Sequence, residues 1–152
     1  MKDTPQGWPR ISSAVFYDDA AAAIPWLCKA FGFTVRLEVK GEAGRIEHSE
    51  LEYGEGLVMV GNSGGKSTRE KPLPGRSPKG LNGANTQSLC VFVDDVDAHA
   101  KVAKAAGATI VLEPTTNDYG PEYWSDRSYG VLDLEGHMWF FMQRMSTKGI
   151  PA

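Results

Sequence analysis

At 152 residues, the chain is long enough for one domain with a real core, or for two half-size modules that share one. Its hydrophobic content of 41% and charged content of 23% are those of ordinary globular proteins, which excludes the disordered and membrane-embedded classes. The net charge of −3 gives no reason to expect nucleic acid or an anionic membrane as a partner. Because residues 1–10 hold two prolines and mixed charge rather than an apolar leader, we expect a cytoplasmic protein.

The first predicted elements are a strand at residues 10–17 and a helix that follows it. Asp18 or Asp19 supplies the helix N-cap, since its carboxylate can accept the free backbone N–H groups of the first turn. Pro25 removes a helical hydrogen bond, so we expect a late start or a kink there. The helix ends at Gly32, and its apolar positions recur at helical spacing: Ile24, Leu27, Cys28 and Phe31.

Three further strands are predicted at residues 34–40, 45–53 and 57–61. The first of them alternates apolar and charged residues, which is typical of a half-buried strand. Short glycine-containing turns at 41–44 and 54–56 predict antiparallel hairpins. The first half therefore has the order β-α-β-β-β.

The second half repeats this order. Asp94 follows Asp18 by 76 residues and Gly107 follows Gly32 by 75, so the two halves keep register as an internal duplication. The predicted elements are a strand at 87–93, a helix ending at Gly107, a strand at 108–112, an extended loop at 113–126, and strands at 128–132 and 137–144.

The second helix and the two cysteines give further expectations about burial. Cys28 and Cys90 lie one in each repeat and are expected to be buried free thiols rather than a disulfide. His99 is expected to be exposed on the second helix, whose core positions are predicted to be Ala98, Val102, Ala105 and Ala106.

The duplication predicts one domain made of two modules, at residues 1–61 and 87–145, with a linker at 62–86 and a tail at 146–152. The linker is rich in glycine and proline and carries a net charge of +4. Such a segment is typical of a solvated linker, although its charge would also suit an anionic ligand.

The segment from residue 126 to residue 139 resembles the sequence of a known protein family. It reads Asp126-Arg127-Ser128-Tyr129-Gly130-Val131-Leu132-Asp133-Leu134-Glu135-Gly136-His137-Met138-Trp139. It resembles the C-terminal sequence motif of the vicinal oxygen chelate superfamily, the group of glyoxalase I, bleomycin resistance proteins and extradiol dioxygenases. Leu134 stands where the turn in that motif usually has proline. The resemblance covers both repeats. It implies an α+β fold in which two βαβββ modules form a curled mixed sheet around a cleft, and it implies a homodimer.

Metal-dependent members of that superfamily take one ligand from the first and the last strand of each module. Carried over to this chain, these positions fall at Ser12, at Met59 or Val60, at Ser88 and at Phe140. None is a histidine or glutamate, and a divalent metal needs three or four strong donors. We therefore expect no metal and no other cofactor.

The resemblance also indicates which side chains face the cleft. By strand alternation they are Ser12, Ala14, Phe16, Ser88, Cys90, Phe92, Met138, Phe140 and Met142. This composition suits an organic-ligand pocket and equally suits a filled core. Arg127 lies among loop aromatics that suit stacking on a planar or cationic ligand, or packing within the loop or against a second subunit: Tyr119, Tyr123, Trp124 and Tyr129.

His48, Glu50 and Glu52 share one face of their predicted strand. A polar stripe of this kind is typical of a solvent-facing side. If this face instead lines the cleft, His48 and Glu50 are the best acid–base candidates in the chain, because a histidine beside a carboxylate can move protons near neutral pH.

Together these features predict metal-independent binding of a small apolar or aromatic compound, that is, sequestration like that of the bleomycin resistance proteins. The predicted ligand-binding residues are Ser12, Phe16, Ser88, Phe92, Tyr119, Trp124, Arg127 and Phe140. One alternative is a glyoxalase-like lyase, isomerase or hydrolase that uses His48 and Glu50. A second alternative is an interaction module whose cleft is filled by its own side chains.

Overall fold

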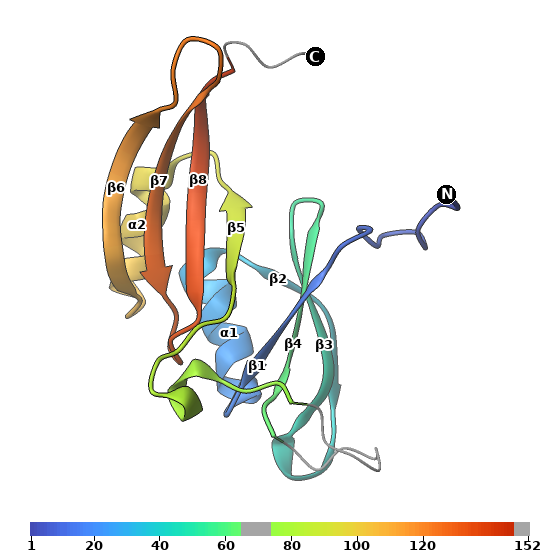
Figure 1. Ribbon diagram of the computed structural model, residues 1–152. Coiled ribbons are helices and arrows are strands. Elements are labelled where there is room, and N and C mark those ends of the chain that lie inside the picture. Colours follow the sequence, from blue (N-terminus) through green and yellow to red (C-terminus); the bar gives the residue numbers. More distant parts are fainter. Residues whose placement is uncertain (65–73, 148–152) are drawn as a thin grey trace. The chain divides into compact units, whose positions relative to one another are not determined.

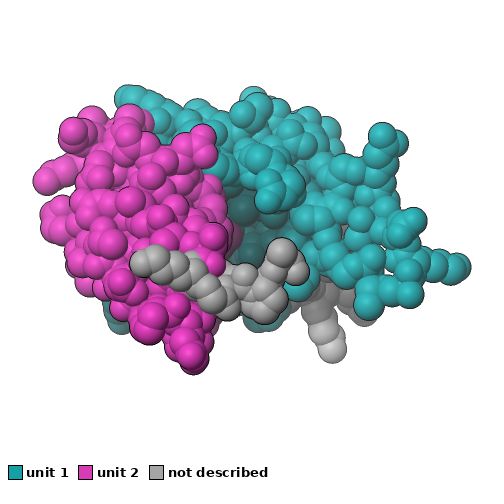
Figure 2. All heavy atoms as spheres, turned by 90° about the horizontal axis from the view of Figure 1, so that it is seen from above, with its two compact units in different colours: residues 1–84 teal, residues 85–152 magenta. Residues whose placement is uncertain are grey.

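The computed structural model describes residues 1–64 and 74–147. The chain divides into two compact units, residues 1–84 and residues 85–152, which are coloured separately in Figure 2. Each unit contains one four-stranded mixed sheet and one α-helix in the order β-α-β-β-β (Figure 1). The predicted α+β class and the duplicated βαβββ module are confirmed.

The first unit has the strand order β1-β4-β3-β2, in which β1 pairs with β4 in parallel and the other neighbours are antiparallel. β1 starts three residues later than predicted, whereas the bounds of the other strands agree within one residue. The elements are β1 (Ser13–Tyr17), α1 (Ala20–Phe31), β2 (Thr34–Lys40), β3 (Ile46–Tyr53) and β4 (Gly56–Asn62), with short 3₁₀ turns at Glu42–Gly44 and Pro78–Leu81.

Helix α1 has the predicted caps. The Asp19 carboxylate accepts a hydrogen bond of 3.0 Å from the backbone N–H of Ala22, and Gly32 ends the helix with a φ of 79°. The late start expected from Pro25 was wrong, since the helix begins at Ala20 and includes the proline. The cap and the burial of the apolar face stabilise the helix. This stabilisation exceeds the cost of the hydrogen bond that Pro25 removes.

The second unit repeats this topology, with the strand order β5-β8-β7-β6 and a parallel β5–β8 pair. Its elements are β5 (Ser88–Phe92), α2 (Val96–Ala105), β6 (Thr109–Asp118), β7 (Ser125–Leu132) and β8 (Met138–Ser146). The loop predicted at residues 113–126 was wrong at both ends, because β7 begins at Ser125 and β6 continues to Asp118. The register shifts between Leu112 and Thr115, around Pro114, and the strand then pairs with β7 again.

The predicted inward face of α2 was wrong. The buried positions are Val96, Ala100 and Ala103, whereas the side chain of Val102 is 53% exposed. His99 is not on the solvent side as expected: its Nδ1 lies 2.7 Å from the Tyr129 hydroxyl, and its ring centroid lies 4.1 Å from that of Phe141. In this alanine-rich helix two stripes satisfy the same spacing, and each contains one valine: Val96 in the buried stripe and Val102 in the exposed one.

Both cysteines are free. Cys28 is half-buried, but Cys90 is exposed, contrary to the expected burial. Cys90 lies on β5, which is an edge strand, and it points away from the helix of its unit.

In each unit the helix covers one face of the sheet, and we call the opposite face the open face. Strand register places Val15, Tyr17 and Leu51 on the α1 side, whereas Ala14, Phe16, Met59, Glu50 and His48 share the open face. In the second unit the α2 side holds Tyr129, Val131, Trp139 and Phe141. Its open face holds Ser88, Cys90, Phe92, Met138, Phe140 and Met142.

Candidate functional site

The segment that carries the family resemblance forms the turn between β7 and β8. The buried carboxylate of Asp133 accepts three hydrogen bonds of 3.0 Å, from the backbone N–H groups of Glu135 and His137 and from Nε1 of Trp139. Gly136 takes a φ of 93° and donates its N–H to the Asp133 carbonyl. The Asp–Gly–His–Trp spacing therefore builds a rigid hairpin end.

Asn85, at the start of the second unit, ties the incoming chain to this turn. Its Nδ2 donates to the Gly136 carbonyl at 2.8 Å, and its Oδ1 accepts from the Met138 N–H at 3.0 Å. These bonds fix the approach to β5, three residues before the strand begins at Ser88.

The open face of the second unit is apolar at its centre. Cys90 pairs with Phe140 and Phe92 pairs with Met142 across the parallel β5–β8 ladder. A Cβ at Gly130 of β7 would lie 2.8 Å from the Met138 terminal methyl, so a larger residue there would require the Met138 side chain to move. Among the predicted ligand-binding residues, Ser88, Phe92 and Phe140 thus share one surface, and the side chain of Phe92 is 53% exposed.

Arg144 continues this face along β8, and sequence reasoning missed it. Its guanidinium carbon lies 5.1 Å from the ring centroid of Trp124 and 5.4 Å from that of Phe92, within the range of cation–π contacts. Its Nε donates to Asp126 at 2.5 Å. The signal was present in the alternation of Met138, Phe140, Met142 and Arg144 along one strand.

Arg127, which was predicted to contact the ligand, lies on the other side of the sheet. Its Nε and Nη2 both contact the carboxylate of Asp97 on α2 at 2.7 Å. This paired hydrogen bonding lowers the pKa of Asp97 and raises the pKa of Arg127. Tyr129 is likewise buried on the α2 side, so the predicted aromatic cluster divides between the two faces.

Three of the predicted aromatics do lie together, at the tip of the β6–β7 hairpin. The ring centroid of Trp124 is 5.8 Å from that of Tyr119 and 6.1 Å from that of Tyr123. The Tyr119 N–H donates to the Trp124 carbonyl and closes the tip. The two tyrosines are exposed, and Trp124 joins this cluster to Arg144.

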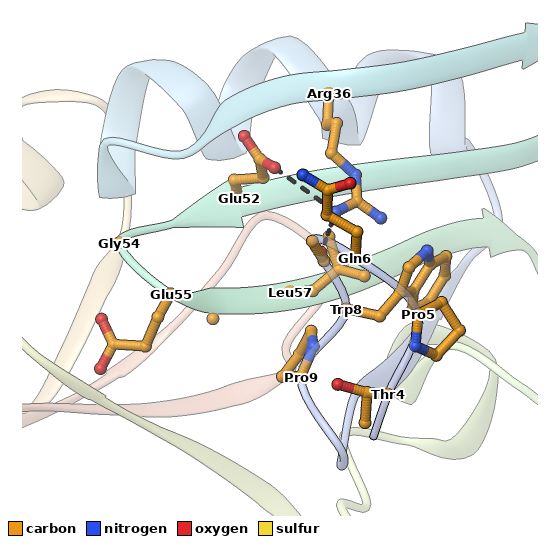
Figure 3. A pocket seen from close by; sticks show the side chains of 12 residues that line it. Thr4, Pro5, Gln6, Trp8, Pro9, Arg36, Glu52, Gly54, Glu55 and Leu57 are labelled. Carbon is orange, nitrogen blue, oxygen red and sulfur yellow. Dashed lines mark hydrogen bonds and ion pairs between the residues drawn. The ribbon is translucent and has the colours of Figure 1, made fainter. Parts of the chain in front are cut away.

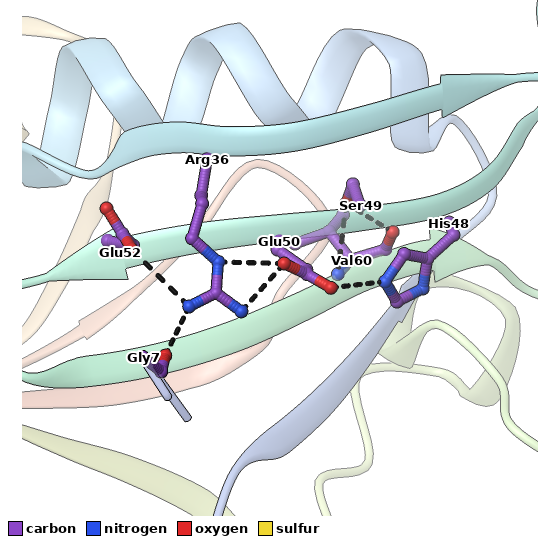
Figure 4. A network of polar contacts seen from close by, with 7 residues as sticks. All are labelled: Gly7, Arg36, His48, Ser49, Glu50, Glu52 and Val60. Atoms are coloured by element: carbon purple, nitrogen blue, oxygen red, sulfur yellow. Dashed lines mark hydrogen bonds and ion pairs between the residues drawn. The ribbon is translucent and has the colours of Figure 1, made fainter. Parts of the chain in front are cut away.

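The open face of the first unit carries a polar network centred on Glu50 (Figure 4). His48 Nε2 lies 2.8 Å from one carboxylate oxygen, and Arg36 contacts the other with Nε at 2.8 Å and Nη2 at 2.7 Å. Arg36 also reaches Glu52 at 3.5 Å. The hydrogen bond from His48 and then the contacts with Arg36 lower the pKa of Glu50.

This network departs from a solvated polar stripe, because the side chain of Glu50 is only 9% exposed. A buried carboxylate is tolerated when it is paired and hydrogen-bonded, as Glu50 is on both oxygens. The side chain of His48 remains 41% exposed. Glu50 therefore orients the imidazole and stays ionised, and His48 is the member of the pair that can exchange a proton with a bound molecule.

A pocket of about 490 Å³ lies beside this network (Figure 3). The guanidinium of Arg36 lies 4.9 Å from the Trp8 ring centroid, and Nη1 of Arg36 donates to the Gly7 carbonyl. These contacts hold the N-terminal segment against β2. The pocket is lined by Thr4, Pro5, Gln6, Gly7, Trp8, Pro9, Arg36, Glu52, Gly54, Glu55, Gly56 and Leu57.

The two remaining predicted residues lie at β1. The ring of Phe16 packs against the chain at Gly75, where an added Cβ would come within 2.5 Å of the ring. Ser12 precedes β1, and its hydroxyl is buried without a hydrogen-bond partner among the residues that the structure describes.

The residues at the carried-over ligand positions do not fit a metal ion. Ser12, Met59, Ser88 and Phe140 supply hydroxyl, thioether and phenyl groups, which are weak donors or none for a divalent cation. Within residues 1–64 and 74–147, no three or more His, Cys, Asp or Glu side chains gather in a way that could hold a metal ion. His48 and Glu50 provide only one imidazole and one carboxylate.

No helix in the described parts of the chain combines the length and the apolar character that crossing a membrane requires.

Two mixed four-stranded sheets, each with a single covering helix and with its first strand parallel to its last, define a duplicated βαβββ protein. A family model matches residues 10–141 and is described as Glyoxalase/Bleomycin resistance protein/Dioxygenase superfamily. The chain belongs to this superfamily, as the sequence resemblance indicated.

Several known proteins are similar to the chain. An uncharacterised protein of Mycobacterium bovis is 32% identical over 136 residues, covering 86% of this chain and 80% of that protein. The crystal structure of TioX from Micromonospora sp. ML1 has a TM-score of 0.67 and 31% identity, covering 90% of this chain and all of that one. An integron cassette protein of Vibrio cholerae, at 20% identity and a TM-score of 0.60, covers 90% of this chain and 95% of its own and shares the fold.

Proposed function

We propose that the protein binds a small apolar or aromatic compound without a metal ion, on the open face of the second unit. The observation that carries this proposal is the apolar surface formed by Phe92, Phe140 and Met142, which is bordered by Trp124 and Arg144. Membership of a superfamily that includes bleomycin resistance proteins supports a binding role of the sequestering kind.

The chemistry of this face favours a planar ligand. A ring that covers about 100 Å² of exposed apolar surface gains roughly 2.5 kcal/mol from burial alone. Asp126 engages Nε of Arg144, and the two Nη groups of that guanidinium form no hydrogen bond with any described residue. Arg144, rather than Arg127, therefore supplies the polar contact, held in place by two aromatic rings.

The test uses 8-anilinonaphthalene-1-sulfonate, an aromatic sulfonate that fluoresces in apolar sites. We expect saturable binding and a rise in Tm, both unchanged by EDTA, because a ligand that prefers the native state stabilises it. Phe140→Ala and Arg144→Gln should each weaken binding several-fold. Val102→Ala, which removes an exposed apolar side chain from α2, is the matched control. Equal affinities in all four proteins, or a fall in Tm with the dye, would refute the proposal.

A second candidate function, acid–base catalysis on a molecule bound at the first unit, is favoured by the 2.8 Å contact between His48 and Glu50. A histidine held by an ionised carboxylate is a suitable general base. If the protein turns over the hemithioacetal of methylglyoxal and glutathione, a glyoxalase-type substrate, His48→Gln should abolish product formation and leave dye binding unchanged. Undiminished turnover in His48→Gln would remove His48 from this role.

A further inference from the structure

We infer that the pocket under the N-terminal segment is a second binding site, and that it takes a small organic cation with an apolar body. This pocket belongs to the first unit and shares no residue with the open face of the second.

The walls of the pocket suit a small molecule. Its volume of about 490 Å³ falls in the range of small-molecule sites. In Figure 3, Trp8 and Pro5 lie on one side of Leu57, and Glu52 and Glu55 lie on the other. Leu57 is 5% exposed and pairs with Glu52 across the β3–β4 hairpin, so the base of the pocket belongs to a rigid sheet.

The charges in and beside the pocket are predominantly negative. The Glu55 carboxylate forms no hydrogen bond or ion pair with any residue that the structure describes, and the Glu52 carboxylate has only the 3.5 Å contact with Arg36. Arg36 is already matched, because two of its nitrogens bind Glu50 and Nη1 donates to Gly7. Two carboxylates at one end therefore retain the capacity to pair with a cation and would repel an anion.

Trp8 is the aromatic side chain of the pocket. Its ring makes a cation–π contact with Arg36 at 4.9 Å, which holds the ring in place at the wall of the pocket. With Pro5, Pro9 and Leu57, it offers apolar surface for the body of a ligand. A molecule with one ammonium group and one aryl or alkyl group satisfies both ends of the pocket.

The test is isothermal titration of the full chain with 2-phenylethylammonium. The neutral 2-phenylethanol and the anionic 3-phenylpropanoate serve as probes of similar shape. We expect the cation to bind at least tenfold more tightly than the alcohol, and we expect no binding of the carboxylate. The double variant Glu52→Gln/Glu55→Gln should lose at least tenfold in affinity for the cation, about 1.4 kcal/mol. Trp8→Leu should also weaken binding.

The control variant is Glu42→Gln, which removes one carboxylate from an exposed turn outside the pocket and should leave affinity unchanged. Far-UV circular dichroism and Tm establish that each variant is folded. The inference is overturned if the three probes bind equally, if the cation fails to bind at concentrations up to about 10 mM, or if the double variant behaves like the control. Phe140→Ala should not alter cation binding, so failure here is separable from failure of the proposed function.

Discussion

Replacing Asp133 by asparagine tests whether the family-type turn is a structural element. The buried carboxylate accepts two backbone N–H groups on one oxygen and the Trp139 indole N–H on the other. An asparagine side chain has one acceptor oxygen and one donor nitrogen. In either orientation, the asparagine NH₂ group therefore points at a buried N–H donor, which is left without an acceptor.

The cost follows from these contacts. Leaving one buried donor unsatisfied costs about 1–3 kcal/mol, and hydrogen bonds to a neutral acceptor are weaker than those to a carboxylate by up to about 1 kcal/mol each. Removing the buried charge recovers part of this loss. We therefore expect Asp133→Asn to lower the unfolding free energy by about 2–4 kcal/mol, which corresponds to a fall in Tm of roughly 5–12 °C for a protein of this size.

Urea unfolding followed by circular dichroism measures this loss, and an unchanged m-value would show that the midpoint reports stability. The matched control is Asp118→Asn, an exposed aspartate whose one bond, to the Gly120 N–H at 2.9 Å, asparagine can keep. The control should lie within about 0.5 kcal/mol of wild type. If Asp133→Asn costs no more than the control, the turn does not depend on the carboxylate.

Three further changes give separate readouts. Ser49→Ala removes a buried hydroxyl that donates to the Val60 carbonyl at 2.6 Å and accepts from the Val60 N–H at 3.2 Å, so it should cost about 1–3 kcal/mol in urea unfolding; an unchanged midpoint would contradict this. Because the pKa of Glu50 is lowered in the folded state, its contribution to stability is present above its ordinary pKa and is lost as the pH falls through the lowered value. Glu50→Gln should therefore flatten the acid side of the stability profile, whereas Glu42→Gln should not, and parallel profiles would refute the assignment. Burial raises the pKa of the Cys28 thiol and Cys90 is exposed, so iodoacetamide should modify Cys90 first in peptide mass spectrometry, and the reverse order would contradict the structure.

The elements with strong local signals could be predicted from the sequence. Asp19 and Gly32 bound α1 because an aspartate cap and a left-handed glycine are local requirements of helix ends. The alternation in β2 predicted its bounds but not its burial, because Val35, Leu37 and Val39 are 40%, 42% and 43% exposed. The buried face of α2 could not be predicted, because alanine occurs on buried and exposed faces alike. Which face is buried depends on packing against the sheet.

The candidate site was only partly predictable, because cross-strand register depends on bulges. His48 and Glu50 are on one strand and were visible as a pair, but Arg36 joins them from β2 across a register shift between Val35 and Leu37. A similar shift at Ser125 and Asp126 separates the faces of neighbouring residues on β7. The alternation along β8 placed Arg144 with Met138 and Phe140. Arg127, by contrast, was predicted to lie outside any strand, and its side of the sheet followed only once β7 was seen to begin at Ser125.

The parallel pairing of β1 with β4 and of β5 with β8 has a consequence for biosynthesis. In the second unit, β8 lies between β5 and β7, so β5 has no hydrogen-bonded neighbour until the ribosome has made residues 138–146. A nascent chain arrested before Met138 would carry an unpaired edge that can pair with other chains. Assembly of this sheet must therefore wait for its last strand to be synthesised, and a premature stop in β8 would remove the middle of the sheet rather than trim its border.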